Sequence, residues 1–294
     1  MTDAGPLALV ERWPVDHAAA VVVDRPGVVH ATGDLHRPFA LASVTKPLFA
    51  TAVLVAVEEG SLALDQPAGP EGSTVRHLLS HASGLGLDGG QLARPGRRRI
   101  YSNAGFEVLG RALADATGLD PATYLEEAVL SPLGMAATVL DGSCAHAATS
   151  TASDLARWAG DLLAPTVVDG STLALATAVA FPGLDGLVPG YGKQSPNDWG
   201  LGFEIKGAKE PHWTAPGGSP TTFGHFGRSG TFVWIDPEVG RALVVLTDRE
   251  FEAWAKPLWP ALGAAVLDAP SSPATATSPA AAAWTGPTVS PASA

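Results

Sequence analysis

A serine and a lysine three residues apart precede a strongly apolar segment. Ser43 and Lys46 stand directly before the segment 47–59, which is apolar almost throughout and stops at a glycine. Because proline is tolerated only in the first turn of a helix, Pro47 places the helix start close to Ser43. Residues three apart in a helix share a face, so the two side chains should meet. An amine held against a hydroxyl can take its proton when burial lowers the pKa of the lysine. A helix-capping serine beside an exposed lysine would give the same pattern.

A phenol and an amide come next along the chain. Tyr101 and Asn103 lie on a predicted loop just before a helix expected over 104–117. Residues two apart in an extended segment point the same way, so both side chains should face one site. A tyrosine near a cationic lysine loses its proton more easily and can act as general base and then acid, while Asn103 can hold a substrate amide or orient Lys46. An ordinary helix cap with a packed aromatic ring is an equally good interpretation of the pair.

The third piece is glycine-rich. Gly224 to Gly230 leads into a predicted strand over 231–236. Glycines let a substrate approach strand backbone closely. A free N–H there can complete an oxyanion hole opposite the N–H of Ser43, and His225 can hydrogen-bond to the tyrosine or to an anionic substrate group.

Taken in order, Ser-x-x-Lys, Tyr-x-Asn and His-x-Gly resemble the signature of serine β-lactamases and penicillin-binding proteins. The chain looks most like the branch with Tyr-x-Asn, which includes class C β-lactamases, D-aminopeptidases, D-alanyl-D-alanine carboxypeptidases and related esterases. The resemblance runs from about Ala18 to Leu267 and is helped by the segments 75–85 and 150–155.

The resemblance implies a set of roles. Ser43 would be the acylated nucleophile, Lys46 its partner and Tyr101 the general base, in a two-step acyl transfer that needs no metal or organic cofactor. The backbone N–H groups of Ser43 and Arg228 would form the oxyanion hole. The residues expected to bind substrate are Asn103, His225, Gly227 and Arg228.

One departure from the family pattern bears on the substrate. His225-Phe226-Gly227 stands where the penicillin-recognising members carry Lys-Thr-Gly. The lysine cation and the threonine hydroxyl of those members would bind a substrate carboxylate, and both groups are missing here. The bulky Phe226 therefore favours esters or amides without that carboxylate over efficient β-lactam hydrolysis.

The elements that position these residues predict an α+β fold. Strand patterns occur near both ends of the chain, and helical patterns fill its middle, so we expect an antiparallel sheet built from both ends, flanked by helices, with a mostly helical region inserted. Residues 1–268 would form one domain, and 269–294, rich in Ala, Pro, Ser and Thr, a disordered tail. The predicted strands are 18–24, 28–32, 200–205, 230–236 and 241–247, and the helices 47–59, 75–81, 104–117, 121–129, 153–163 and 250–267.

Composition narrows the function further. The net charge of -11 and the pI of about 5.1 argue against nucleic-acid binding. We interpret the arginine run 97–99 as a solvated loop edge. Cys144 is the only cysteine, so no internal disulfide or cysteine metal cluster is possible. No secretory leader or membrane span is recognisable, and we expect a cytoplasmic protein whose partner is a small ester, amide or short peptide, of oligomeric state unknown.

Several rival interpretations remain. His77 and His81 have zinc-protease spacing, but Leu78 takes the place of the catalytic glutamate, and no Gly-x-Ser-x-Gly elbow marks an α/β-hydrolase. The alternative from another class is a non-catalytic relative that binds a cell-wall peptide or a partner. Of the late tryptophans, Trp213 is the one we expect to be best placed to reach substrate.

Overall fold

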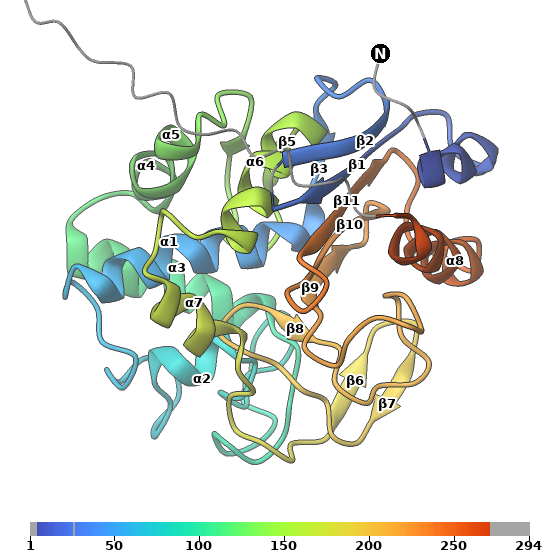
Figure 1. The fold of residues 1–294 in the computed structure, drawn as a ribbon. Coiled ribbons are helices and arrows are strands. Elements are labelled where there is room, and N and C mark those ends of the chain that lie inside the picture. The colour runs from blue at the N-terminus through green and yellow to red at the C-terminus, as the bar shows by residue number, and fades with distance from the viewer. Residues whose placement is uncertain (1–4, 26, 271–294) are drawn as a thin grey trace, which may run out of the picture.

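Strands from both ends of the chain make up the main sheet. The computed structural model describes residues 5–25 and 27–270. Six antiparallel strands follow the order β2-β1-β11-β10-β9-β8, so the first strand pairs directly with the last (Figure 1). This confirms the predicted α+β arrangement. The strands are β1 (Ala18–Asp24), β2 (Gly27–Gly33), β8 (Glu204–Ile205), β9 (Phe223–Gly227), β10 (Thr231–Asp236) and β11 (Arg241–Thr247).

Helices dominate the middle of the chain and close its described part. They are the 3₁₀ segments η1 (Gly5–Arg12) and η2 (Ala42–Val44), the π-helical turn η3 (Glu126–Leu130), and α1 (Thr45–Glu58), α2 (Val75–Leu79), α3 (Asn103–Thr117), α4 (Pro121–Leu125), α5 (Ser131–Leu133), α6 (Ala152–Leu163), α7 (Gly170–Thr177) and α8 (Ala255–Asp268). Helix α1 is apolar on every side because it is buried on every side, and Pro47 sits in its first turn.

Both faces of the main sheet are covered, because successive strand residues point to opposite sides. On β1, Ala19, Val21 and Val23 belong to the core shared with α1 and α6, whereas Ala20 and Val22 belong to a second core formed with η1 and α8. Figure 1 shows α1 and α6 on one side of β1 and β11, with η1 and α8 on the other. The main sheet is therefore packed on both faces, and its strand β9 carries the predicted site residue His225.

Several short strands were not predicted from the sequence. They form a three-stranded sheet of β3 (Phe39–Ala40), β5 (Ala148–Ser150) and β4 (Val139–Leu140), and a hairpin of β6 (Gly186–Val188) and β7 (Gly192–Gln194). Two or three residues are too few to show an alternating pattern.

Several predicted elements are shorter than expected, and hydrogen bonds explain two of them. The strand expected over 200–205 is reduced to β8, because the N–H of Gly200 bonds to the carbonyl of Phe203 at 2.9 Å and turns the chain. The closing helix starts at Ala255 rather than residue 250, since the N–H of Phe251 is committed to the carbonyl of Arg228 at 2.7 Å. The predicted tail lies, beyond Pro270, outside the described residues. Every helix in residues 5–25 and 27–270 is too short or too polar to span a bilayer.

The expectation of a solvated arginine run is wrong for Arg99. Its side chain is 3% exposed, and its guanidinium donates to the carbonyls of Ser80 at 2.6 Å, Ala180 at 2.7 Å and Asn197 at 3.1 Å. Burial lowers the pKa of Arg99 to about 10, so it stays charged at neutral pH. Arg99 thus ties the end of α2 to two later loops.

Replacing Arg99 by alanine should lower the free energy of unfolding by about 3 kcal/mol, because several buried carbonyls lose their donor at once. The exposed neighbour Arg98 supplies the control: Arg98→Ala should change it by less than about 0.5 kcal/mol. Urea denaturation followed by circular dichroism measures both. Equal effects of the two substitutions would show that the buried contacts of Arg99 contribute nothing.

Candidate active site

Ser43 lies in a tight turn between β3 and α1. The residue before it, Ala42, has a φ of 45°, a left-handed conformation that alanine rarely adopts. The carbonyl of Leu41 accepts a hydrogen bond from the Thr231 hydroxyl of β10 at 3.0 Å. This contact holds the turn against the sheet and directs the Ser43 side chain towards a cleft.

Gly227 allows that approach. A Cβ at this position would lie 2.3 Å from the Leu41 carbonyl oxygen and 3.2 Å from the Ala42 Cβ. Gly227 does not line the cleft, so its place in the third motif is to let β9 pack against the serine turn. Sequence reasoning placed it among the substrate contacts, whereas the geometry makes it a backbone-packing position.

Lys46 is completely buried, and its amine has three polar neighbours. The Nζ atom lies 2.7 Å from Asn103 Oδ1, 2.9 Å from the Ala145 carbonyl oxygen and 3.5 Å from Ser43 Oγ. Burial lowers the pKa of Lys46 to about 7, although the carboxylates of Glu107 and Asp88 raise it. The amine is therefore about half neutral near pH 7, and its neutral fraction grows as the pH rises.

A neutral amine has two N–H donors and one lone pair. The Ala145 carbonyl can only accept a hydrogen bond. The oxygen of the Asn103 amide faces Lys46, because the Nδ2 atom of the same amide donates to Asp88 Oδ1 at 3.3 Å. The two acceptors take the two N–H groups. The lone pair of the neutral amine then faces Ser43 Oγ at 3.5 Å and can take its proton, which is what a general base requires, whereas in the ammonium form the third N–H donates to Ser43 Oγ.

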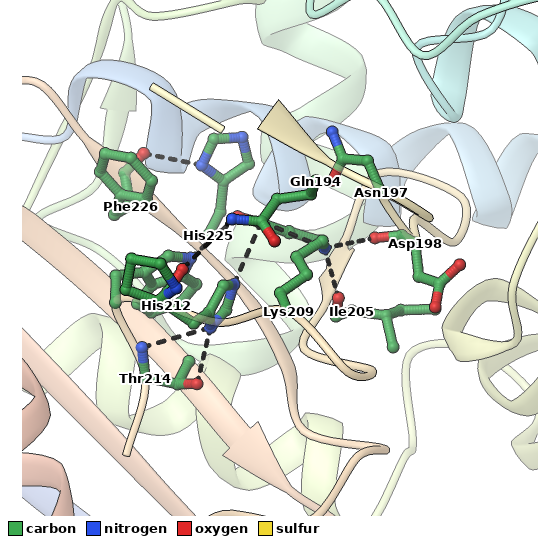
Figure 2. Close-up of polar contacts among 12 residues, drawn as sticks. Gln194, Asn197, Asp198, Ile205, Lys209, His212, Thr214, His225 and Phe226 are labelled. Carbon is green, nitrogen blue, oxygen red and sulfur yellow. Dashed lines mark hydrogen bonds and ion pairs between the residues drawn. The ribbon is translucent and has the colours of Figure 1, made fainter. Parts of the chain in front are cut away.

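Tyr101 and His225 meet above Ser43. The Tyr101 hydroxyl lies 3.4 Å from His225 Nε2. His225 Nδ1 lies 2.7 Å from the Phe226 carbonyl oxygen (Figure 2). Because that carbonyl can only accept, Nδ1 carries the proton and Nε2 accepts from the tyrosine. Burial lowers the pKa of His225 to about 3, so the ring is neutral at pH 7.

The expectation that lysine makes Tyr101 more acidic is wrong. Burial raises the pKa of Tyr101 above its usual value, and the hydrogen bond with Ser43 lowers it only in part. Lys46 contacts the face of the ring, with Nζ 4.6 Å from its centroid, but burial of the hydroxyl is the larger effect. In the resting site Tyr101 is a phenol, that is, a proton donor.

The cleft is mostly apolar and has a volume of about 390 Å³. Ser43 and Arg228, the two residues predicted to form the oxyanion hole, both line this cleft. The Arg228 side chain is 81% exposed and pairs with Glu250 at 3.3 Å. Within the described residues, no three His, Cys, Asp or Glu side chains gather closely enough to hold a metal ion. The other lining residues are Leu87, Tyr101, Asn103, Pro189, Gly190, Trp199, Glu204, His225, Phe226 and Phe251.

Sequence reasoning missed the aromatic support of the tyrosine. His81 packs on the Tyr101 ring with centroids 4.5 Å apart, and its Nδ1 accepts from the Ser102 N–H at 3.2 Å. His77, its partner in the zinc interpretation, instead stacks on Phe181 at 4.3 Å. No signal besides the zinc-like spacing pointed to His81.

The tryptophan expected to reach substrate is the wrong one. Trp213 is 1% exposed and does not line the cleft; its Nε1 donates to Glu204 Oε2 at 2.8 Å. Trp199 lines the cleft instead and lies against Tyr101 with ring centroids 6.0 Å apart. Trp213 belongs to the core between the sheet and α8.

Glu204 is a buried carboxylate that the sequence did not reveal. Lys209 Nζ and His212 Nε2 each lie 3.2 Å from its Oε1. Burial alone would raise the pKa of Glu204, but these partners lower it below its usual value. Lys209 also donates to the carbonyl of Asp198, and His212 contacts Thr214 (Figure 2). The ion pair holds the loop after β8 beside the cleft.

Solved structures of other proteins share this fold. The structure is similar to a β-lactamase from Mycobacterium bovis, with 57% identity and a TM-score of 0.88 over 89% of this chain and 98% of that one. It shares its fold with the unliganded simvastatin synthase of Aspergillus terreus, at 17% identity and a TM-score of 0.73 over 90% of this chain and 96% of that one.

Two curated proteins match by sequence. Esterase EstB from Burkholderia gladioli is 37% identical over 145 residues, which is 33% of this chain and 37% of the esterase. Penicillin-binding protein 4* from Bacillus subtilis is 28% identical over 133 residues, which is 33% of this chain and 29% of that protein. The chain thus spans about a third of the length of these relatives. The family model described as Beta-lactamase matches residues 15–267, so the chain belongs to the β-lactamase family.

Proposed function

We propose that this protein is a serine hydrolase that cleaves esters or amides through an acyl-enzyme at Ser43. The observation that carries the proposal is the buried Lys46, whose amine lies against Ser43 Oγ, Asn103 Oδ1 and the Ala145 carbonyl, and whose pKa burial lowers to about 7. The family membership and the esterase among the relatives support the same reaction class.

In the first step Ser43 Oγ attacks the substrate carbonyl while its proton passes to Lys46 Nζ. The N–H groups of Ser43 and Arg228 stabilise the oxyanion. When the tetrahedral intermediate collapses, the leaving group departs with the proton of Tyr101. The acyl-enzyme then contains an ammonium at Lys46 and a phenolate at Tyr101, so the two charges stabilise each other.

In the second step the phenolate of Tyr101 takes a proton from water, and the resulting hydroxide attacks the acyl carbonyl. Lys46 returns its proton to Ser43 Oγ as the acid product leaves. Every group is then in its starting state, and no proton is left over. His225, neutral and fixed in one tautomer, accepts the Tyr101 hydrogen bond in the resting site and so holds the phenol oxygen in place until its proton passes to the leaving group.

The substrate we infer is a small ester or amide without a carboxylate at the third motif. His225 is neutral, and Phe226 is 6% exposed among aromatic side chains, so neither supplies a fixed cation. The cleft walls formed by Leu87, Trp199 and Phe251 suit an apolar acyl or alkyl group. We therefore expect β-lactams to be hydrolysed poorly.

Removal of the nucleophile gives the first test. Ser43→Ala should abolish turnover of p-nitrophenyl butyrate and labelling by a fluorophosphonate, while circular dichroism and thermal unfolding stay as in wild type. Intact-protein mass spectrometry measures the labelling, and nitrocefin hydrolysis should be slow compared with the ester. Comparable ester turnover by the variant would refute the assignment, and a folded wild-type protein inert to all three reagents would favour a binding module.

The pH dependence of kcat/KM tests the role of Lys46. Since the base must be unprotonated and its pKa is about 7, kcat/KM should be constant above that pH. It should fall about tenfold for each pH unit below it, because Lys46 gains a proton. Initial rates with p-nitrophenyl butyrate between pH 5 and pH 9 give the profile. A flat profile across this interval would exclude Lys46 as the base.

Loss of the Tyr101 hydroxyl should slow both steps. Tyr101→Phe keeps the ring that packs on His81 but removes the proton donor, so kcat should fall by about 10²–10³. Tyr191→Phe is the matched control, because the Tyr191 hydroxyl is buried and has no hydrogen-bond partner among the described residues. Steady-state kinetics with the butyrate ester compares the two. If both variants retained wild-type kcat, Tyr101 would have no part in proton transfer.

A further inference from the structure

Asn103, one of the two hydrogen-bond acceptors of Lys46, is itself held by the carboxylate of Asp88. Asn103 begins α3, and its amide Nδ2 lies 3.3 Å from Asp88 Oδ1. The backbone N–H of Asn103 donates to the Leu87 carbonyl at 2.7 Å, which docks the loop carrying Asp88 onto the start of α3. A carboxylate only accepts hydrogen bonds. Asp88 therefore selects the amide orientation in which the oxygen, not the NH₂ group, faces Lys46.

The other acceptor, the Ala145 carbonyl, is held by the carboxylate of Glu107 through Ser143. The N–H of Ala145 donates to Ser143 Oγ at 3.1 Å, and the Ser143 hydroxyl donates to Glu107 Oε1. Glu107 lies one turn after Asn103 on α3. The turn that presents the Ala145 carbonyl to Lys46 is thus tethered to the helix that presents the Asn103 amide.

We propose that Asp88 and Glu107 are positioning residues that fix the two hydrogen-bond acceptors of Lys46 and thereby keep its lone pair directed at Ser43. The inference rests on the proposed function, since it concerns the same base. Neither carboxylate is hydrogen-bonded to the Lys46 amine, and each positions it through the acceptor that it holds.

The same two carboxylates set the charge around the amine. Glu107 and Asp88 both raise the pKa of Lys46 against the effect of burial. His81 and His225 also face this site, and burial lowers the pKa of each, so both are neutral and leave the carboxylates as the charged influences on Lys46. Geometry and charge can be separated by choosing substitutions that remove one and keep the other.

Asp88→Asn and Glu107→Gln keep a hydrogen-bond acceptor but remove the charge. Each should move the titration midpoint of Lys46 to lower pH by at least about 0.3 unit, because a nearby negative charge that favours the ammonium is lost. The plateau of kcat/KM should stay within about twofold of wild type. Protein labelled with ¹³C at lysine Cε reports the midpoint by NMR without any need for activity, and the lysines to be resolved are Lys46, Lys193, Lys206, Lys209 and Lys256.

Asp88→Ala and Glu107→Ala remove the acceptor as well. The plateau of kcat/KM should fall about tenfold, since Asn103 or the 143–145 turn is no longer fixed, while KM changes little. Asp88 is exposed, so its alanine variant leaves the core packing intact. Recovery of the plateau in the asparagine and glutamine variants separates a positioning role from a merely structural one.

The matched control is Asp115→Asn, which removes a charge from an exposed position on the same helix. It should leave the Lys46 midpoint and the plateau unchanged. An unmoved or raised midpoint in both charge-removing variants, or alanine variants with a wild-type plateau, would overturn the proposal. A wild-type protein without Ser43-dependent turnover would instead refute the proposed function, and the NMR midpoints would still decide whether the two carboxylates act on Lys46.

Discussion

The site depends on the burial of one amine. A lysine removed from water pays a large desolvation penalty as an ammonium, so it becomes neutral near physiological pH and must find acceptors for its remaining protons. Asn103 and the Ala145 carbonyl satisfy this requirement for Lys46 and so decide where its lone pair points. The apolar helix α1 is what carries the lysine into the core: a more polar helix would leave it hydrated, with an ordinary pKa.

That requirement explains why the site is assembled from distant parts of the chain. Ser43 comes from η2, Lys46 from the first turn of α1, Tyr101 from the loop before α3, Asn103 from the first residue of α3, and His225 from β9. These parts are brought together by the pairing of the two chain ends in one sheet and by the close approach of β9 to the serine turn. Away from the reacting atoms, the buried Arg99 and the Glu204–Lys209 pair fix the loops that line the cleft.

Much of this arrangement could be predicted from the sequence, because it follows from local rules. Pro47 fixes a helix start, residues three apart share a helix face, and residues two apart in an extended segment face one side. The sequence could not predict contacts that depend on tertiary packing. Three adjacent arginines look alike in the sequence, and only the fold shows that Arg99 is buried. For the same reason, the sequence did not show that Trp213 is buried or that Trp199 lines the cleft. The acidity of Tyr101 was misjudged because its burial, not its neighbour, sets the direction of the shift.

The central claim is that catalysis passes through an acyl group on Ser43. The most direct measurement is acid quenching of the enzyme during turnover of p-nitrophenyl butyrate, followed by proteolysis and mass spectrometry of the peptides. The account predicts a butyryl ester on Ser43 that disappears once the substrate is exhausted. Turnover with no acyl group on Ser43, or with the butyryl group on another residue, would contradict it.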